Sequence, residues 1–205
     1  MTNSQAHWQN VYQTKGEREV SWFQEDPAPS LELIARAGAT GSSAIVDVGG
    51  GASRLVDVLL ERGFQDVTVL DISAAALAAT CNRLGRAAER ATWIVGDMTI
   101  WRPEARYDIW HDRAAFHFLN TPEQQRAYAE RLRQALKAGG HAVIGAFALD
   151  GPEKCSGLPV RRHSAESIAA VLGSGFALTD SRRHQHRTPW DSEQSFQFCT
   201  FARTE

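Results

Sequence analysis

The stretch Ala44-Ile45-Val46-Asp47-Val48-Gly49-Gly50-Gly51-Ala52-Ser53 decides the fold of this 205-residue chain. It joins a short β-branched run, which ends in an acid, to three glycines and to a serine that can cap a helix. Glycine lets the backbone turn sharply and brings its N–H groups against a ligand. A strand, a glycine turn and a helix in this order predict the nucleotide-binding corner of a doubly wound sheet.

The spacing of the glycines excludes two common ligand classes. A dinucleotide fingerprint needs glycines at the first, third and sixth positions of the turn, but Arg54 stands at the sixth, after Gly49 and Gly51. No Gly-Lys-Ser/Thr follows, which excludes a phosphate-cradling P-loop. The carboxylate of Asp47 beside the turn repels a pyrophosphate and suits a ligand with a cationic end. S-adenosylmethionine carries an ammonium, a sulfonium and no phosphate, so the electrostatics favour it as the cofactor.

Two further acids follow predicted strands. Asp71 ends the run Val67–Asp71, about twenty residues beyond the glycine turn, which is the separation at which an acid reaches ribose hydroxyls. We expect the next residue, Ile72, to contact the cofactor as well. The third run, Thr92–Val95, leads into Gly96, Asp97 and Met98, where Asp97 is placed to accept from an adenine amino group and Met98 to pack on the ring. Three acids, each at the end of a successive predicted strand, strongly support S-adenosylmethionine as the cofactor.

Bulk properties limit the class of protein. The net charge of −2 gives no reason to expect nucleic acid as a partner. The three cysteines form no CxxC pair, which disfavours a disulfide framework and a zinc site, and we expect no metal. The N-terminus lacks the apolar core of a signal peptide, and no window approaches eighteen consecutive apolar residues. We therefore expect a cytoplasmic protein with no membrane partner.

The order of elements predicts an α/β fold. Strands and helices alternate as in a parallel sheet, and we expect a doubly wound, mostly parallel seven-stranded sheet of Rossmann-like type with an antiparallel C-terminal strand pair. The predicted strands are 44–48, 67–71, 92–95, 107–111, 141–147, 176–181 and 195–202. Helix caps are predicted at Ser30, Ser53, Ser73, Thr121 and Ser164. Residues 1–40 form a predicted N-terminal helical lid, and residues 41–205 the cofactor-binding catalytic domain, as one structural unit.

This order of elements and its three acids resemble the class I S-adenosylmethionine-dependent methyltransferases over nearly the whole chain. The resemblance implies that Asp47, Gly49 and Gly51 hold the methionine part of the cofactor, Asp71 the ribose and Asp97 the adenine. The run Leu136-Lys137-Ala138-Gly139-Gly140 resembles the Leu-Lys-Pro-Gly-Gly corner of that family before its fifth strand, with alanine in place of proline.

Other segments resemble a narrower group of small bacterial stand-alone methyltransferases. They are 7–12, 19–23, 112–118 and 150–158. The N-terminal Trp/Tyr and Val-Ser-Trp-Phe pattern is also similar to protein-lysine methyltransferases that act on elongation factors. The resemblance therefore implies the cofactor more firmly than the substrate.

The residues after the fourth predicted strand are candidates for the chemistry. Ligands of an open α/β sheet bind beyond the carboxyl ends of its strands. His117 is the leading candidate for a substrate-side acid or base, because its ordinary pKa lies in the working range; a buried packing histidine is the alternative. Asp112 is a candidate for catalysis or cofactor binding, and it can equally fix the loop through Arg113. Trp22 is assigned to the cofactor pocket, where an aromatic ring attracts the sulfonium, and Trp8 to packing.

The predicted function is methyl transfer to a small-molecule acceptor by in-line displacement. A protein lysine is the alternative acceptor and would need an acidic or aromatic entry channel beside Trp22 and His117. A nonenzymatic S-adenosylmethionine-binding protein is a third possibility. A nicotinamide-dependent dehydrogenase is disfavoured by Arg54 and by the lack of a Tyr-x-x-x-Lys pair.

Overall fold

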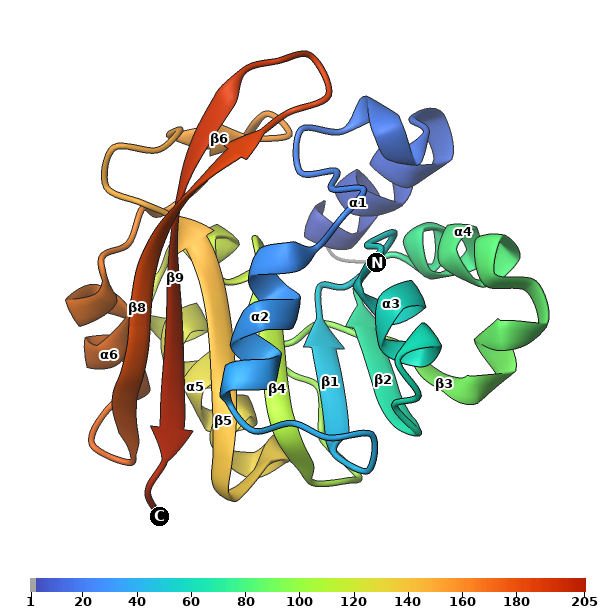
Figure 1. Cartoon of the computed structure of the whole chain (residues 1–205). Helices are drawn as coiled ribbons and strands as arrows, with labels where there is room; N and C mark the ends of the chain where they lie inside the picture. Colours follow the sequence, from blue (N-terminus) through green and yellow to red (C-terminus); the bar gives the residue numbers. More distant parts are fainter. Residues whose placement is uncertain (1–2) are drawn as a thin grey trace.

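The computed structural model describes residues 3–205 and contains a seven-stranded sheet with helices on both faces (Figure 1). The strand order is β3-β2-β1-β4-β5-β9-β8, in which the first five strands are parallel and the last two join antiparallel. The strands are β1 (Ala44–Val48), β2 (Asp66–Asp71), β3 (Ala91–Val95), β4 (Tyr107–Arg113), β5 (Leu136–Phe147), β8 (Phe176–Arg187) and β9 (Glu193–Arg203), and a separate antiparallel pair is formed by β6 (Lys154–Cys155) and β7 (Leu158–Pro159). The predicted α/β sheet and its antiparallel C-terminal pair are confirmed.

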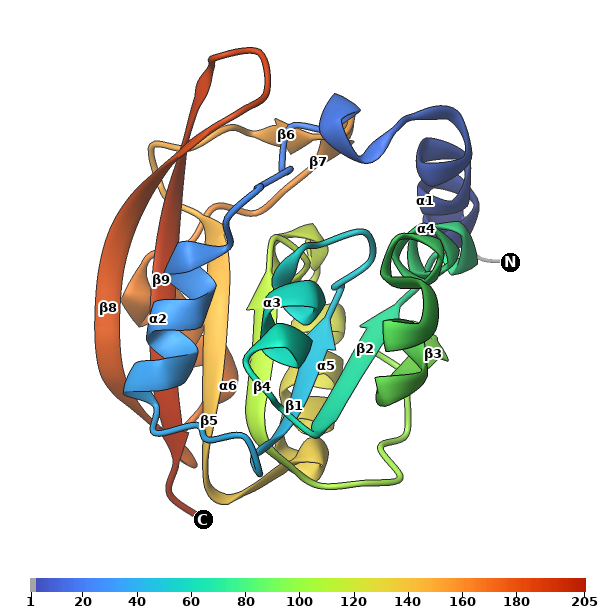
Figure 2. The ribbon, with the colours of Figure 1, turned by 45° about the vertical axis from the view of Figure 1, so that its right-hand side comes forward.

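The helices cover the two faces of the sheet in different groups (Figures 1 and 2). Helices α2 (Ala28–Arg36) and α3 (Leu55–Glu61) lie on one face, and α5 (Pro122–Ala135) and α6 (Ala165–Leu172) on the other. Helix α1 (Asn3–Thr14) lies beside α4 (Ala74–Leu84), and short 3₁₀ turns span Glu17–Glu19, Gly85–Arg90 and Phe116–Phe118. Because both faces are covered, the parallel strands are apolar on both sides, as Ile45 and Val46 show.

Local sequence signals explain where α4, α5 and α6 begin. Ser73 accepts a hydrogen bond from the N–H of Ala76 at the start of α4. Thr121 and Gln124 form the predicted capping box of α5, and Ser164 caps α6. The predicted cap at Ser30 is wrong, because α2 begins two residues earlier at Ala28 and Ser30 is buried inside the helix.

Strands β5 and β8 are much longer than predicted. The Gly139–Gly140 corner was expected to precede the fifth strand, yet β5 already begins at Leu136. The pairs Tyr107–Leu136 and Ile109–His141 show that residues 137–140 bulge out of the ladder, where Gly139 has a φ of 75°. The polar residues 182–187 were expected to form a turn, but they pair with β9 in a long hairpin whose tip extends beyond the sheet (Figure 1).

The N-terminal segment, defined here as residues 3–24, covers the carboxyl ends of the parallel strands. Helix α1 is tied to α4 by Gln9, whose Oε1 accepts from Ala75 N at 3.0 Å and from Ser73 Oγ at 3.2 Å. Glu17 forms ion pairs with Arg54 and Arg83, which links the segment to α3 and α4. Helix α2, by contrast, packs on the face of the sheet against β4 and β5. Within residues 3–205, no helix combines the length and the apolarity needed to cross a membrane.

Candidate functional site

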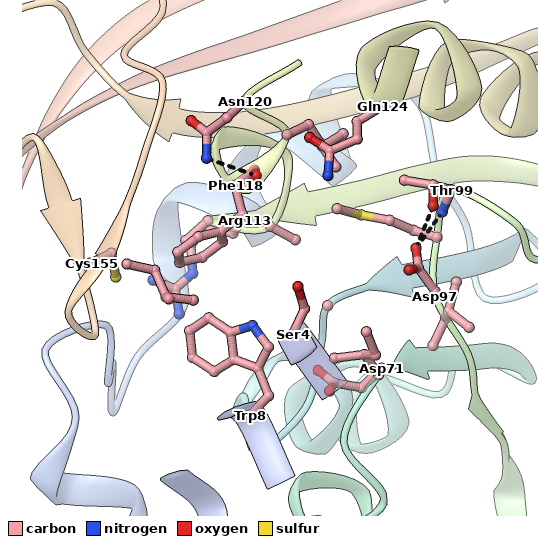
Figure 3. A pocket seen from close by; sticks show the side chains of 18 of the residues that line it. Ser4, Trp8, Asp71, Asp97, Thr99, Arg113, Phe118, Asn120, Gln124 and Cys155 are labelled. Atoms are coloured by element: carbon pink, nitrogen blue, oxygen red, sulfur yellow. Dashed lines mark hydrogen bonds between the residues drawn. The ribbon is translucent and has the colours of Figure 1, made fainter. Parts of the chain in front are cut away.

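A cavity of about 420 Å³ lies between the carboxyl ends of β1, β2 and β4 and the N-terminal segment (Figure 3). The size falls within the range of small-molecule pockets. Its walls come from four regions: the N-terminal segment, the turns after β1, β2 and β3, the residues after β4, and the β6–β7 pair. The cavity is therefore at the position that the sheet topology predicts for a ligand.

The glycine turn forms the floor of the cavity at Gly49. A Cβ atom on Gly49 would lie 2.5 Å from the Cβ of Ala115, and the φ of this residue is 70°. Gly51 has a φ of 39°, and a Cβ there would lie 2.7 Å from Oδ2 of Asp71. Both positions thus require glycine for conformation and for space.

Asp71 is placed at the end of β2 and lines the cavity together with Ile72. Its Oδ1 accepts from the N–H of Ser73 at 2.8 Å. Burial raises the pKa of Asp71 to about 7, and the neighbouring charge of Asp47 adds to this. A ligand hydroxyl that donates to the carboxylate would favour its ionised form, so this site is suited to a neutral diol.

Asp97 lies at the same end of the cavity, after β3. Its Oδ1 accepts from both the N–H and the hydroxyl of Thr99, at 2.8 and 2.7 Å, which fixes the carboxylate (Figure 3). Met98 and Leu70 line the cavity beside it. A fixed hydrogen-bond acceptor next to apolar side chains is the arrangement that binds an amino-substituted aromatic ring.

Aromatic side chains form the cavity wall to which the N-terminal segment contributes. The rings of Trp8 and Trp22 are 5.6 Å apart and those of Trp8 and Phe118 are 5.0 Å apart, all edge to face. Trp22 Nε1 donates to the hydroxyl of Tyr12 at 3.1 Å. Trp22 lines the cavity as predicted, and so does Trp8, which was assigned to packing.

Arg113 lines the end of the cavity opposite Asp71 and Asp97 (Figure 3). Its Nη2 donates to the carbonyl of Trp22 at 2.9 Å, and its Nη1 has no hydrogen-bond partner among residues 3–205. Burial lowers the pKa of Arg113, while the charge of Asp47 opposes that change. Sequence reasoning placed Arg113 among the residues that follow the fourth strand and face the ligand, and as a partner for Asp112, but it gave Arg113 no role of its own.

Four predicted site residues do not line the cavity: Asp47, Gly51, Asp112 and His117. Asp47 is 2% exposed, and its Oδ1 is 2.7 Å from Nδ1 of His111. Asp112 is fully buried and accepts hydrogen bonds from Tyr128 Oη at 2.9 Å and from two backbone N–H groups of the following turn, at residues 115 and 116. His117 is fully buried too, and burial lowers its pKa to about 3.

Several lining residues were missed by the sequence analysis. Gln124 was recognised only as part of a capping box, and the loop after β5 was named only as a substrate region. The missed residues include Ser4, Thr99, Leu119, Asn120, Gln124, Leu158 and Pro159. Their positions depend on how the turn after β4 and the β6–β7 pair fold over the cavity, for which the sequence carries no periodic signal.

Comparison with known proteins gives one family and many similar folds. The methyltransferase domain family matches residues 45–140. The sequence matches no curated protein. A solved structure described with the conversion of a disulfide bond into a thioacetal group during echinomycin biosynthesis is 21% identical, with a TM-score of 0.77 over 98% of this chain and 93% of that chain.

Two solved methyltransferases are similar over nearly the same extent. The 1,6-didemethyltoxoflavin-N1-methyltransferase of Burkholderia thailandensis, solved with S-adenosylhomocysteine, is 21% identical, with a TM-score of 0.73 over 98% of this chain and 88% of that chain. The N-methyltransferase NodS of Bradyrhizobium japonicum, also with S-adenosylhomocysteine, is 16% identical, with a TM-score of 0.71 over 96% and 100%. At these identities the solved structures establish the fold of the chain. Residues 45–140 thus match the methyltransferase domain family, and the chain has the class I fold of methyltransferases that were solved with S-adenosylhomocysteine.

Proposed function

We propose that the protein transfers a methyl group from S-adenosylmethionine to a small-molecule acceptor, and that both bind in the cavity of about 420 Å³. The acid pair at one end of this cavity carries the proposal. Asp71 and Asp97 present carboxylates from successive strand ends, with no basic side chain among the described lining residues on that side. This charge pattern fits an adenosine and rejects a phosphate.

The residues present fit the cofactor part by part. In our assignment Asp71 and Ile72 hold the ribose, Asp97 and Met98 the adenine, and Gly49 and Gly51 the methionine part. The position of Gly49 in the cavity lining supports this, because a glycine there lets the backbone approach the ligand closely. Trp22 is assigned to the sulfonium side through its ring, which attracts a cation. Asp47 acts on the same part from beneath the turn.

The acceptor is assigned to the opposite half of the cavity. Its described lining is mostly apolar, with the two amide side chains of Asn120 and Gln124. The bound cofactor supplies a methyl group on a positively charged sulfur, which any well-placed nucleophile attacks. The aromatic wall and the β6–β7 pair cover this half, so their part is to exclude water and to align the acceptor.

The titratable groups at the cavity limit the kind of acceptor. Burial raises the pKa of Cys155 to about 11 and raises that of Tyr12 further, so both stay protonated at neutral pH. His117 lies outside the lining, and its lowered pKa keeps it neutral. We therefore propose an acceptor whose nucleophilic atom has a free lone pair near neutral pH, such as a ring nitrogen, a weakly basic amine or a thiolate.

A protein lysine is the second candidate acceptor. The aromatic contacts of Trp8 with Trp22 and Phe118 favour it, because aromatic rings attract an ammonium. The only cation of the described lining, Arg113, lies at the same end and opposes it. Since no carboxylate of the described lining stands on this side, the small-molecule reading is preferred.

Calorimetric titration with S-adenosylmethionine and S-adenosylhomocysteine tests the cofactor site. Asp71→Asn should weaken both ligands on the order of 10- to 100-fold, the worth of a charged hydrogen bond. Asp66→Asn is the matched control, because Asp66 is exposed at the other end of the same strand. Equal affinities in all three proteins would contradict the assignment.

The acceptor class is tested by release of S-adenosylhomocysteine in a screen. The screen should contain small N-heterocycles, weakly basic amines and thiols in one arm and lysine-containing protein extracts in the other. Turnover in the first arm alone supports the proposal. Turnover in the protein arm alone would replace it with the lysine alternative.

A further inference from the structure

The cavity carries opposite charges at its two ends. Asp71 and Asp97 occupy one end, and Arg113 the other (Figure 3). Among the described residues that line the cavity, Arg113 is the single side chain with a positive charge. A ligand that spans the cavity should therefore carry hydroxyl or amino groups at the first end and a negative charge at the second.

The guanidinium of Arg113 is incompletely paired. Nη2 donates to the carbonyl of Trp22, while Nη1 is out of contact with solvent and finds no acceptor in the part of the chain that the structure describes. No ion pair recorded for residues 3–205 includes Arg113. Buried charges in native proteins are normally paired, so the missing partner points to a ligand.

The position of Arg113 relative to the glycine turn identifies the ligand group. Strands β1 and β4 are in register at Val48 and Asp112, so the next residues, Gly49 after β1 and Arg113 at the end of β4, are neighbours. With the adenine at Asp97 and the ribose at Asp71, the amino-acid end of the cofactor comes to the glycine turn. Resting on that proposed function, we propose that Arg113 binds the α-carboxylate of S-adenosylmethionine.

A small hollow supports this placement. It has a volume of about 10 Å³ and lies between Arg113, Trp22 and the residues 52–54 that follow the glycine turn. That is close to the space of one water-sized atom, enough for one carboxylate oxygen. A guanidinium presents N–H groups in a planar fork that matches a carboxylate.

The same geometry couples the donor to the N-terminal segment. Because Nη1 is enclosed, a carboxylate reaches it only with a shift of the chain around Trp22 or of the guanidinium itself. The donor carboxylate and the Trp22 carbonyl then share one guanidinium. Binding of S-adenosylmethionine thus stabilises the N-terminal segment in its position over the cavity.

An anionic acceptor is the competing occupant. It would approach from the side of Cys155 and Phe118, which also line this end. The two sources are separated by a ligand that lacks only the amino-acid part. 5′-Deoxy-5′-methylthioadenosine retains the adenosine and the sulfur of S-adenosylhomocysteine but has no carboxylate.

The experiment is calorimetric titration of both ligands into the wild-type protein, Arg113→Met and Arg113→Lys. Arg113→Met should raise the Kd of S-adenosylhomocysteine on the order of 10- to 100-fold, as expected for a charged hydrogen bond, and leave that of methylthioadenosine nearly unchanged. Arg113→Lys should restore part of the loss. Arg54→Met is the matched control: Arg54 borders the small hollow but pairs with Glu17, so its loss should not discriminate between the two ligands.

Each other result has a definite meaning. An equal loss for both ligands in Arg113→Met would assign Arg113 a purely structural role and overturn the inference. Unchanged affinity for S-adenosylhomocysteine would also overturn it, and would assign Arg113 to the acceptor if the KM of an anionic acceptor rose. A wild-type protein that binds methylthioadenosine as tightly as S-adenosylhomocysteine overturns the carboxylate site alone. One that binds neither ligand overturns the proposed function with it.

Discussion

Lowering the pH from 7.5 to 5.0 should destabilise the protein through His117, and Asn at this position should remove that effect. His117 is fully buried between the rings of Phe118 and Phe147. Its Nδ1 accepts from the N–H of Phe147 at 3.3 Å, and its Nε2 has no partner among residues 3–205. Burial and the neighbouring charges of His163 and Arg113 lower its pKa from 6.5 to about 3.

The magnitude follows from the difference between folded and unfolded states. The unfolded chain protonates this histidine below its ordinary pKa of 6.5, while the folded chain keeps it neutral down to about pH 3. The stabilisation is therefore complete above pH 6.5 and is lost as the pH falls toward 3. At pH 5.0 the loss is about 2 kcal/mol, because each pKa unit corresponds to about 1.4 kcal/mol.

Urea denaturation at both pH values measures this difference. In His117→Asn the amide oxygen can still accept from Phe147, so the packing loss is the same at both pH values. Buried His163 and the raised pKa values of Asp71 and Asp112 also change stability with pH, but they do so in both proteins. The wild type should lose about 2 kcal/mol more than the variant between pH 7.5 and 5.0. An equal loss of unfolding free energy in the wild type and in His117→Asn would refute the reasoning.

Three further outcomes are expected. Because the pKa of Asp71 lies at about 7, affinity for S-adenosylhomocysteine should fall up to about tenfold per pH unit below pH 7, and titrations of Asp71→Asn should show no such decline. Gly51→Ala should lower the Tm more than Gly38→Ala, because both have a positive φ but only Gly51 would place a Cβ against Asp71. Glu17→Gln removes two ion pairs and should speed tryptic cleavage within residues 3–24, and S-adenosylhomocysteine should slow that cleavage in the wild type.

The part of the site that the sequence predicts is the part set by strand ends. Parallel strands bring their carboxyl ends to one edge, so Gly49, Asp71 and Asp97 converge whatever the helices do. The same rule explains why the fold could be predicted. Alternating strands and helices with clear caps, such as Thr121 and Ser164, leave few topologies open.

The roles of the residues near the end of β4 could not be predicted, because this strand is longer than its sequence pattern indicates. It was expected to end at His111, with Asp112 and Arg113 both in a loop, but it continues to Arg113. Successive residues of a strand face opposite sides, so Asp112 turns to Tyr128 on α5 while Arg113 turns to the cavity. In the short turn that follows, Phe118 lines the cavity and His117 faces Phe147. A difference of two residues thus exchanges which side chains meet the ligand.

Three polar side chains from distant parts of the sequence meet beneath the glycine turn, and no spacing in the sequence predicts this contact. Asp47 on β1, His111 on β4 and Ser30 on α2 form a chain, with His111 Nδ1 2.7 Å from Asp47 Oδ1 and His111 Nε2 2.8 Å from Ser30 Oγ. The order Asp-His-Ser is that of a hydrolase triad, but Ser30 is 1% exposed and lines no cavity described here, so it cannot reach a substrate. The chain instead fixes the carboxylate whose Oδ2 would lie 2.5 Å from a Cβ on Gly50. Asp47 therefore lies against the glycine turn in a fixed position, and Ser30 of α2 supports that position through the buried His111.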